Sequence, residues 1–350
     1  MSARYSQLRV AVVGFGSIGR RHVENLQRLG VRRITIVRRP HGSNPAFTPP
    51  AGALIVDKTE AAIANGLDLA VICNPTSLHL AAAEQFARTG VPVLIEKPLA
   101  MDLQQAEAAR NWLTTAPAPI GVAYCLRYHP AYRLAREALL EGKIGQVQSA
   151  RAWFASYLPD WHPWEDYRTS YAARPEQGGG VLPTLDHELD YLLWCFGAPT
   201  EVRGRSWRSG QLEMPADDSA ECALRFGDDV CAEIRLSMCQ PRGSRGFEFV
   251  GSRGALHLDW GTGQLDWRNE SGGKPTDALL WNHPDWDVNV MYVDLLRDAL
   301  EAAMAKRPFP IPWQTGRESL RAIASVERLS SNDVATGLSV ASSPNVGVFA

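Results

Sequence analysis

Two short stretches of the sequence combine residue types that bind and move protons. The first is Glu96-Lys97-Pro98, which ends an apolar run that begins at Val91. A lysine at the end of a buried strand, followed by a proline that fixes the chain, offers a cationic donor to a developing negative charge. The second stretch places His187 in the first turn of a helix expected over residues 184–196. The helix dipole lowers the pKa of such an imidazole, so His187 suits a neutral general base.

A glycine-rich turn near the N-terminus predicts what these groups work with. Residues 8–22 read LRVAVVGFGSIGRRH, an apolar strand that breaks at GxGxxG and continues as a helical pattern. The first glycine makes a tight turn, the second lets the backbone approach a pyrophosphate, and the third allows close packing of helix on strand. The turn therefore predicts dinucleotide binding by a Rossmann unit. The expected contacts are Gly14, Phe15, Gly16, Ser17, Ile18 and Gly19.

The end of the second expected strand bears on which dinucleotide is bound. An NAD enzyme usually carries Asp or Glu about twenty residues after the glycines, where it binds the ribose hydroxyls. Here Arg38 and Arg39 stand there instead. Because a guanidinium pairs with a 2′-phosphate that a carboxylate would repel, we predict NADP in preference to NAD. The alternative is that both arginines are solvated loop charges and the site takes NAD loosely.

Further cofactor contacts are expected where later strands end. Asn74 and Pro75 follow the fourth strand, at the carboxyl edge of the sheet where open α/β folds bind ligands. We predict that both lie near the nicotinamide ribose, with Glu96 and Lys97 at the next strand end. His79, one turn into the following helix, either joins this site or packs inside the protein.

An aromatic and polar stretch in the second half of the chain suits a carbohydrate. Trp161, Tyr167 and Arg168 lie in the run WHPWEDYRTSY, shortly before Gly178-Gly179-Gly180. A sugar presents one apolar face and a rim of hydroxyls, so flat aromatic rings beside charged groups match it. A protein contact surface would use similar residues. We favour a sugar-like substrate held by Trp161, Tyr167 and Arg168.

Composition excludes several other classes of function. Lys and Arg total 36 and Asp and Glu total 38, so the net charge of -2 gives no sign of a nucleic-acid partner. The 6 cysteines are scattered without metal-ligand spacing, which predicts free thiols and no metal site. No signal-peptide core and no apolar run of membrane-spanning length occur. We expect a cytoplasmic protein with no membrane partner.

Taken together, these motifs resemble the Gfo/Idh/MocA oxidoreductases, over residues 8–340. The resemblance rests on the N-terminal GxGxxG, on Asn-Pro-x-x-x-His from Asn74 to His79, and on Glu96-Lys97-Pro98. It implies NAD(P)-dependent hydride transfer at a secondary alcohol carbon of a sugar, a sugar derivative or a cyclitol. It also implies that Lys97 touches both substrate and cofactor, and that the Lys97-Pro98 peptide bond is cis. Arg127, in Arg127-Tyr128-His129-Pro130, resembles the family's Arg-x-His-Pro at the domain junction and is a predicted substrate contact.

The chain departs from the family pattern at one position. The family signature resembles Gly-Gly-Gly-x-x-x-Asp followed by His-x-x-Asp, with the histidine and the first acid at the reacting hydroxyl. His187 and Asp190 match the second part, and we predict that Asp190 binds substrate, but Thr184 replaces the first acid. A threonine can hydrogen-bond a hydroxyl but cannot act as a base at neutral pH. Either His187 takes the proton with Lys97, or Asp186 supplies the carboxylate from a shifted position; the alternative for Asp186 is a simple helix-dipole residue.

The expected architecture has two parts. Residues 1–126 should form a doubly wound parallel Rossmann sheet (α/β), and residues 127–350 an α+β substrate domain on an open, mainly antiparallel sheet. By resemblance, the outer face of that sheet builds a homo-oligomer, a dimer or tetramer. Two other functions stay open: a dinucleotide-binding regulator or scaffold without turnover, and an enzyme that oxidises its substrate transiently and recycles the cofactor.

Overall fold

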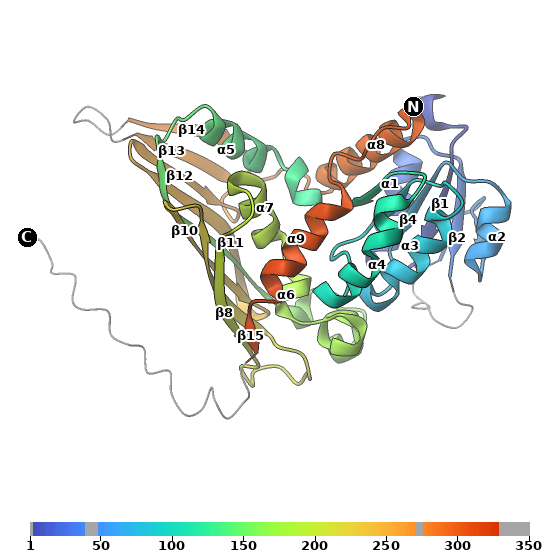
Figure 1. Ribbon diagram of the computed structural model, residues 1–350, viewed down its shortest axis with the longest axis horizontal. Coiled ribbons are helices and arrows are strands. Elements are labelled where there is room, and N and C mark those ends of the chain that lie inside the picture. Colours follow the sequence, from blue (N-terminus) through green and yellow to red (C-terminus); the bar gives the residue numbers. More distant parts are fainter. Residues whose placement is uncertain (1–2, 39–47, 270–275, 329–350) are drawn as a thin grey trace, which may run out of the picture.

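The structure is a computed structural model, and it describes residues 3–38, 48–269 and 276–328. Two β-sheets stand at opposite ends of the molecule with helices between them (Figure 1). Within the described residues, six parallel strands form the first sheet in the order β3-β2-β1-β4-β5-β6. They are β1 (Arg9–Val13), β2 (Arg33–Val37), β3 (Leu54–Val56), β4 (Leu69–Ile72), β5 (Val93–Ile95) and β6 (Ile120–Val122).

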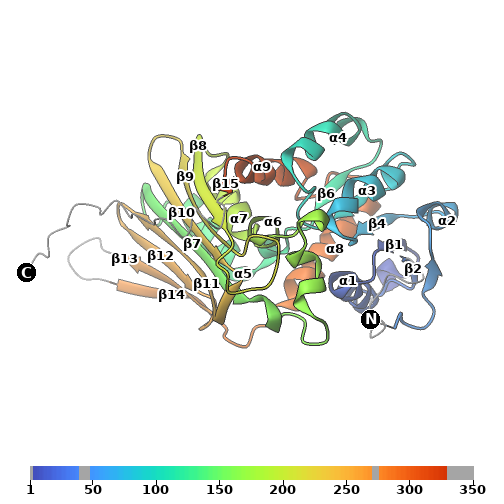
Figure 2. The ribbon, with the colours of Figure 1, turned by 90° about the horizontal axis from the view of Figure 1, so that it is seen from below.

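Helices cover both faces of this sheet, which explains the uninterrupted apolar runs in its strands. α1 (Ser17–Arg28) lies on one face, whereas α3 (His79–Ala87) and α4 (Leu103–Thr115) lie on the other (Figure 2). α2 (Thr59–Ala64) contacts α3. Strand order reverses between β1 and β4, and ligands of open α/β sheets bind at such a switch point. The turn after β1 and the turn after β4 therefore meet where a dinucleotide is expected.

The second sheet is wider and mostly antiparallel, as the sequence predicts. Its strands in the described ranges run β14-β13-β12-β11-β7-β10-β9-β8-β15. Only two of the pairings recorded there, β10 with β7 and β15 with β8, are parallel. The strands are β7 (Val147–Tyr157), β8 (Glu201–Trp207), β9 (Ser219–Phe226), β10 (Val230–Ser237), β11 (Cys239–Gly251), β12 (Gly254–Asp259), β13 (Gln264–Asn269), β14 (Thr276–Asn282) and β15 (Glu327–Arg328).

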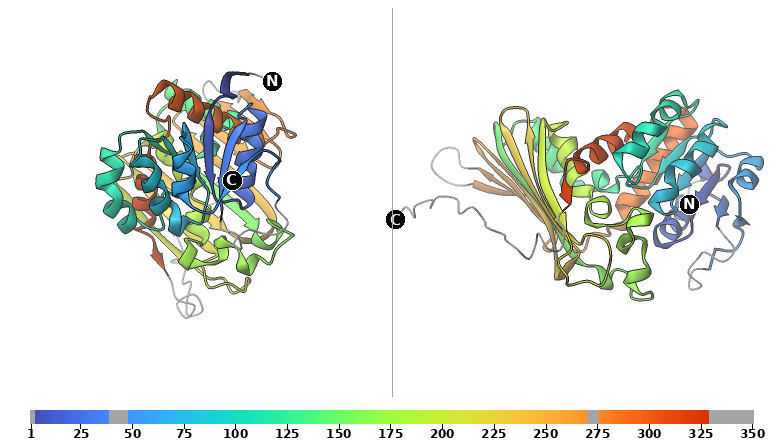
Figure 3. Two further views of the ribbon diagram at one scale, coloured as in Figure 1. Left: turned by 90° about the vertical axis from the view of Figure 1, so that its right-hand side faces the viewer. Right: turned by 60° about the horizontal axis from the view of Figure 1, so that its bottom comes forward.

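The inner face of this sheet packs on three helices, and its outer face points away from the first sheet (Figure 3). The helices are α5 (Pro130–Leu140), α6 (Val181–Thr184) and α7 (His187–Phe196). Phe247 and Phe249 of β11 stack with ring centroids 4.4 Å apart and are buried on the inner face. The outer-face positions of β10, Glu233 and Arg235, are exposed, so the strand alternates as a half-buried strand should.

Three elements differ from the sequence prediction. The helix expected over residues 184–196 begins only at His187, as α7, and Thr184 instead ends the separate short helix α6. β11 begins at Cys239, well before the expected start at Phe247. The prediction missed the first half of the strand because its sequence (QPRGSRG) has the composition of a turn. A register shift lies between Cys239 and Ser244, where this half joins β7. β14 was not expected, because its sequence lies beside polar residues and lacks alternation.

The last helices return to the first sheet. α8 (Asn289–Ala305) packs beside α1, and α9 (Trp313–Ile323) packs on α4 and β6. Gly121 of β6 bridges to Pro312, and a Cβ at Gly121 would lie 2.8 Å from that of Phe309. The N-terminal core is thus completed by the end of the described chain, and the boundary at residue 126 stays a prediction. No described helix combines the length and apolar character needed to cross a membrane.

Candidate active site

Lys97 is held at the carboxyl end of β5 and points across to the second half of the chain. Its ammonium donates a hydrogen bond to the carbonyl oxygen of Thr184. It also lies 3.4 Å from a carboxylate oxygen of Asp186. Burial is the largest single influence and lowers the pKa of Lys97, but Asp186, with help from Tyr171 and Glu96, more than compensates and leaves that pKa raised. Lys97 is therefore a charged donor at the junction of the two halves. The Lys97-Pro98 bond is cis, as the resemblance implies.

A residue between α6 and α7 places its carboxylate beside Lys97. α6 ends at Thr184 and α7 begins at His187, so Asp186 lies in the gap between them. Its side chain is fully buried and makes no cap hydrogen bond to its own helix, and its second oxygen accepts 2.8 Å from the hydroxyl of Tyr124. Burial raises the pKa of Asp186 to about 6, although Lys97 and Tyr124 oppose the rise. The carboxylate faces Lys97 from a shifted position, which favours that alternative over a helix-dipole role.

His187 stands next to this pair on α7. Its Nε2 lies 3.9 Å from the sulfur of Cys125, and its ring meets that of Tyr124 edge-on at 6.0 Å. Nδ1 is buried without a partner among the described residues. Burial, with smaller contributions from Lys97 and Arg245, holds the pKa of His187 well below its usual value. The imidazole is neutral at neutral pH, as its helical position predicts.

Thr184 contributes through its backbone. Its carbonyl accepts from Lys97 at the point where the helix breaks. Its hydroxyl is buried without a partner in the described part of the chain, although the residue lies beside Lys97. A buried hydroxyl without a partner costs free energy, and the burial of its oxygen keeps it away from an entering ligand.

The glycine-rich turn fits a dinucleotide phosphate. Gly14 has φ +93°, and a Cβ there would lie 2.7 Å from the backbone nitrogen of Asn74. A Cβ at Gly19 would lie 2.2 Å from the carbonyl oxygen of Gly14. Nothing lies within 4 Å of a Cβ at Gly16, so there the backbone is open to an approaching group. Between the glycines, Phe15 is buried, whereas Ser17 and Ile18 are half-buried at the start of α1.

The predicted contacts near the nicotinamide fall into two groups. Asn74 keeps its side-chain oxygen buried and unpartnered within the described residues, and Pro75 beside it is exposed. His79 is buried, with its two ring nitrogens 2.8 Å from the Pro98 carbonyl and 2.9 Å from the Asn74 carbonyl. The carboxylate of Glu96 lies 2.6 Å from the ring of buried His22. His79 and Glu96 thus make hydrogen bonds within the protein, and these bonds hold the loops that carry Asn74 and Lys97.

Two arginines, Arg38 and Arg39, are predicted at the adenosine end of the dinucleotide. Arg38 is half-buried directly after β2, and its backbone nitrogen donates to the Val56 carbonyl. Arg39 lies outside the described residues. Arg38 therefore follows the second strand directly, as the NADP prediction requires, and the preference for NADP stays a prediction.

The predicted residues of the aromatic stretch hydrogen-bond to other parts of the protein. Trp161 donates 3.1 Å to the hydroxyl of Ser156. The hydroxyl of Tyr167 accepts 3.0 Å from the backbone of Glu213, and Arg168 pairs with Asp166 and with the Glu213 carboxylate. These hydrogen bonds give the stretch its shape. Whether its rings hold a sugar stays a prediction.

Arg127 and Asp190 meet each other. The guanidinium donates two hydrogen bonds, of 2.9 Å and 2.7 Å, to the two oxygens of Asp190. Asp190 is fully buried, so a substrate cannot reach it, whereas Arg127 keeps a small exposed edge. The pair ties the 3-10 helix η3 (Cys125–Tyr128) to α7.

Sequence reasoning missed Tyr124, Glu188 and Arg245. Tyr124 follows β6 in an apolar run and looked like core. Arg245 donates 2.7 Å to Glu188, and it lies in the half of β11 that resembled a turn. Glu188 directly follows His187, but only the strand register reveals its partner.

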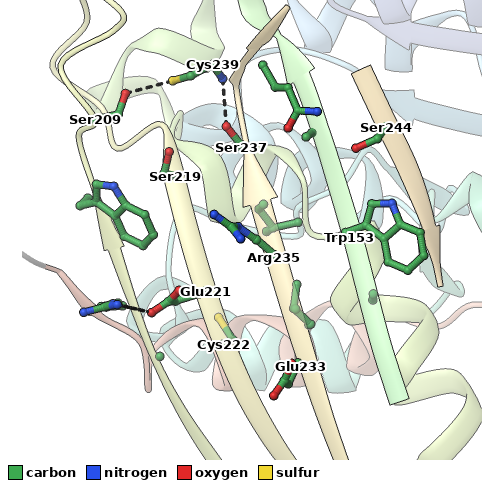
Figure 4. Close-up of a pocket in the computed structure, with 18 of the residues that line it drawn as sticks. Trp153, Ser209, Ser219, Glu221, Cys222, Glu233, Arg235, Ser237, Cys239 and Ser244 are labelled. Carbon is green, nitrogen blue, oxygen red and sulfur yellow. Dashed lines mark hydrogen bonds and ion pairs between the residues drawn. The ribbon is translucent and has the colours of Figure 1, made fainter. Parts of the chain in front are cut away.

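A wide hollow lies elsewhere, on the outer face of the second sheet (Figure 4). It has a volume of about 1410 Å³ and is lined by residues of β7, β8, β9, β10 and β11, among them Trp153, Glu221 and Arg235. None of the predicted site residues lines it. The candidate active site is instead the junction around Lys97.

The sequence also matches known families over most of its length. Residues 8–124 match an oxidoreductase family described as an NAD-binding Rossmann fold, and residues 132–257 match the GFO/IDH/MocA C-terminal domain. The chain belongs to the Gfo/Idh/MocA oxidoreductase family. Its Rossmann part is therefore an NAD(P)-binding unit, in agreement with the glycine turn.

Relatives in this family include sugar and cyclitol enzymes. The myo-inositol dehydrogenase Hyg17 of Streptomyces leeuwenhoekii is 28% identical over 254 residues, or 71% of this chain and 75% of that protein. The 1,5-anhydro-D-fructose reductase of Ensifer adhaerens is 31% identical over 192 residues, or 54% of this chain and 56% of that protein. Among solved structures, a levoglucosan dehydrogenase in complex with NADH has a TM-score of 0.78 at 17% identity and covers 91% of this chain and 96% of its own. That likeness shows the shared fold.

Proposed function

We propose that the protein transfers a hydride between the nicotinamide of NAD(P) and a secondary alcohol carbon of a sugar, a sugar derivative or a cyclitol. One observation carries the proposal: the ammonium of Lys97, 3.4 Å from the buried carboxylate of Asp186, lies close enough to the neutral ring of His187 for its charge to help lower the pKa of that ring. The named activities of the inositol dehydrogenase and anhydrofructose reductase relatives support the substrate class.

The chain's own residues divide the work of a proton transfer. Lys97, which keeps a small exposed edge, binds the reacting oxygen and stabilises its negative charge. His187, neutral, takes the hydroxyl proton during oxidation. Asp186 is fully buried and therefore positions Lys97 and keeps it charged rather than touching substrate. Thr184 positions Lys97 through its carbonyl oxygen, and its own hydroxyl oxygen is buried.

The glycine turn, with Gly14, Gly16 and Gly19, would hold the dinucleotide, and Asn74 would meet its nicotinamide ribose. When bound, the dinucleotide supplies the hydride acceptor or donor. Arg38 favours NADP over NAD, because a guanidinium at the end of the second strand pairs with a 2′-phosphate. The protein supplies alignment and charge.

The test is to incubate the protein with NAD or NADP and a panel of polyols, and to follow the near-ultraviolet absorbance of reduced nicotinamide. Myo-inositol, D-glucose and levoglucosan are suitable neutral probes. A dehydrogenase produces a net absorbance change, and product analysis identifies the oxidised carbon. Substrate conversion without net change would indicate cofactor recycling instead. Dinucleotide binding without any conversion would indicate a regulator or scaffold.

We also propose that a second copy of the chain covers the outer face of the second sheet. Cross-strand neighbours there form a row of alternating character, in which Trp153 neighbours Arg235, Arg235 neighbours Glu221 and Glu221 neighbours Arg205 (Figure 4). A two-fold interface must complement itself, and a row that contains both signs of charge and large aromatic rings meets that requirement.

The six free thiols agree with the reducing cytoplasm that we predict for the protein.

A further inference from the structure

Charges at the candidate active site occur as matched pairs. Lys97 lies 3.4 Å from Asp186, and Arg127 lies 2.7 Å from Asp190. Arg245 lies 2.7 Å from Glu188. All three carboxylates have fully buried side chains, whereas the three cations are 12%, 12% and 11% exposed. Each cation therefore keeps an edge toward solvent, and its own carboxylate neutralises it from behind.

Arg245 belongs to an aromatic wall beside His187. It stands on β11 directly across from Phe154 of β7. Its guanidinium carbon lies 4.5 Å from the ring centre of Phe154 and 5.1 Å from that of Trp260. Glu188, which holds Arg245, is the residue after His187 on α7. The inner face of the sheet thus presents two partly exposed rings and one neutralised cation next to the proposed base.

From this arrangement we infer that the ring of the substrate is uncharged, a neutral polyol that bears neither a carboxylate nor a phosphate. The inference rests on the proposed function and narrows its substrate class. A bound anion needs a cation whose charge is not already balanced, because desolvating the anion is costly. Beside Lys97, Arg127 and Arg245 an anion would also meet the field of a carboxylate behind each cation. Hydroxyl groups lose less on leaving water and pair with the exposed edges of the cations, while Phe154 and Trp260 offer apolar faces to the C–H side of a sugar.

Glu188 is the residue that sets this preference at the aromatic wall. Glu188→Gln keeps the size and hydrogen-bonding atoms of the side chain and removes its charge. Arg245 would then be an unbalanced cation beside the substrate. The variant should therefore accept a ring carboxylate that the natural protein rejects, which is a gain and not only a loss.

The experiment compares D-glucose with D-glucuronate, and myo-inositol with D-glucose 6-phosphate, each with saturating dinucleotide. For the natural protein we expect kcat/KM to favour the neutral sugar by about a hundredfold or more, the scale at which an unmatched polar or charged group is rejected. Glu188→Gln should move the glucuronate-to-glucose ratio by at least about tenfold toward glucuronate. Calorimetric titration of D-glucuronate into the same variant should show binding independently of turnover. Glu84→Gln, which removes a carboxylate from an exposed pair with Arg88 on α3, is the matched control and should leave the ratio unchanged.

The possible failures are distinguishable. If the natural protein oxidises none of the neutral or anionic probes, the proposed function is wrong. If it oxidises D-glucuronate or D-glucose 6-phosphate better than the neutral sugars, the function stands and the neutral-substrate inference is overturned. An unchanged ratio in folded Glu188→Gln also overturns it. If that variant does not fold, the double variant Glu188→Gln/Arg245→Gln removes both charges and should keep the preference for neutral sugars. A preference of the double variant for glucuronate would contradict the inference. The comparison of neutral and anionic sugars on the natural protein tests the inference in either case.

Discussion

The carboxylate of Asp186 lies 3.4 Å from the ammonium of Lys97, although the two residues come from opposite halves of the chain. Thr184 stands where the resemblance leads us to expect an acid, and the helix breaks directly after it. The break turns Asp186 toward Lys97 and the hydroxyl of Tyr124. These contacts support our proposal that Asp186, two positions along, serves in place of the acid expected at Thr184.

Lys97→Ala should lower turnover by about two to four orders of magnitude, because it removes the donor that stabilises charge on the reacting oxygen. Dinucleotide binding, measured by fluorescence titration, should persist, since the glycine turn is untouched. Lys143→Ala is the matched control, because Lys143 is a surface residue paired with Glu141. Turnover retained within a factor of a few in Lys97→Ala would contradict the catalytic role.

Asp186→Asn should lower turnover by about a hundredfold and flatten the acidic limb of the pH profile. The pKa of Asp186 is raised to about 6, so in the natural protein the acid protonates below that pH and Lys97 loses its counter-charge. We expect turnover to fall as the pH drops through about 6. The pKa of Asp186, about 6, lies inside the range from pH 5 to 7. A kcat of the natural protein that stays constant over this range would therefore exclude a role of Asp186 in keeping Lys97 active.

The same titration affects stability with a defined sign. The pKa of Asp186 is higher in the folded protein (about 6) than its ordinary value of 3.8, so the folded state binds this proton more tightly than the unfolded chain. The group favours folding most below its ordinary pKa, and that contribution is lost as pH rises through about 6. Urea unfolding at several pH values should show the natural protein losing stability relative to Asp186→Asn across this window, and no further change above it.

Arg38→Asp should weaken NADP binding by about tenfold or more and leave NAD binding nearly unchanged or improved, because a carboxylate repels the 2′-phosphate. The measurement is the ratio of the two dissociation constants. Arg33→Asp, at the opposite end of β2, is the control. Equal binding of both dinucleotides before and after Arg38→Asp would contradict the NADP preference.

Asp190→Ala should destabilise the protein by about 3–5 kcal/mol, because it leaves the buried side of Arg127 without its carboxylate. Denaturant unfolding monitored by circular dichroism measures the loss. Arg127→Met/Asp190→Leu removes both charges and should recover most of the stability. A single variant as stable as the natural protein would mean that the pair is not what joins η3 to α7.

Arg235→Glu should break the proposed assembly, because it places two like charges side by side with Glu221 in the middle of the outer face. Light scattering after gel filtration should show the natural protein as a dimer or tetramer and the variant as a single chain. Arg110→Glu, on the exposed side of α4, should leave the mass unchanged. A natural protein with the mass of one chain would refute the assembly.

The sequence predicted the fold well where one physical requirement dominates. The apolar run before Gly14, the positive φ that the turn needs at that glycine, and the close approach at Gly19 have few solutions, and the structure contains them. The neutral state predicted for His187 agrees with its lowered pKa, but the largest cause of that shift is burial and not the helix start on which the prediction rested.

The rest depended on contacts between distant segments. Nothing local indicates that the helix breaks after Thr184, because Lys97, which binds its carbonyl, comes from another domain of the sequence. Arg245 lies in a glycine-rich run typical of turns, and only pairing with β7 makes it part of a strand. The ion pair of Arg127 with Asp190 was likewise hidden, and both residues were assigned to substrate instead.

The contact of Gly121 with the segment from Phe309 to Pro312 has a consequence for synthesis. An N-terminal half leaving the ribosome contains the glycine turn but lacks the helix that covers β6, so this flank of the sheet stays uncovered until α9 has been synthesised. A chimera that contains the Rossmann half should therefore also contain α9, because this helix covers β6.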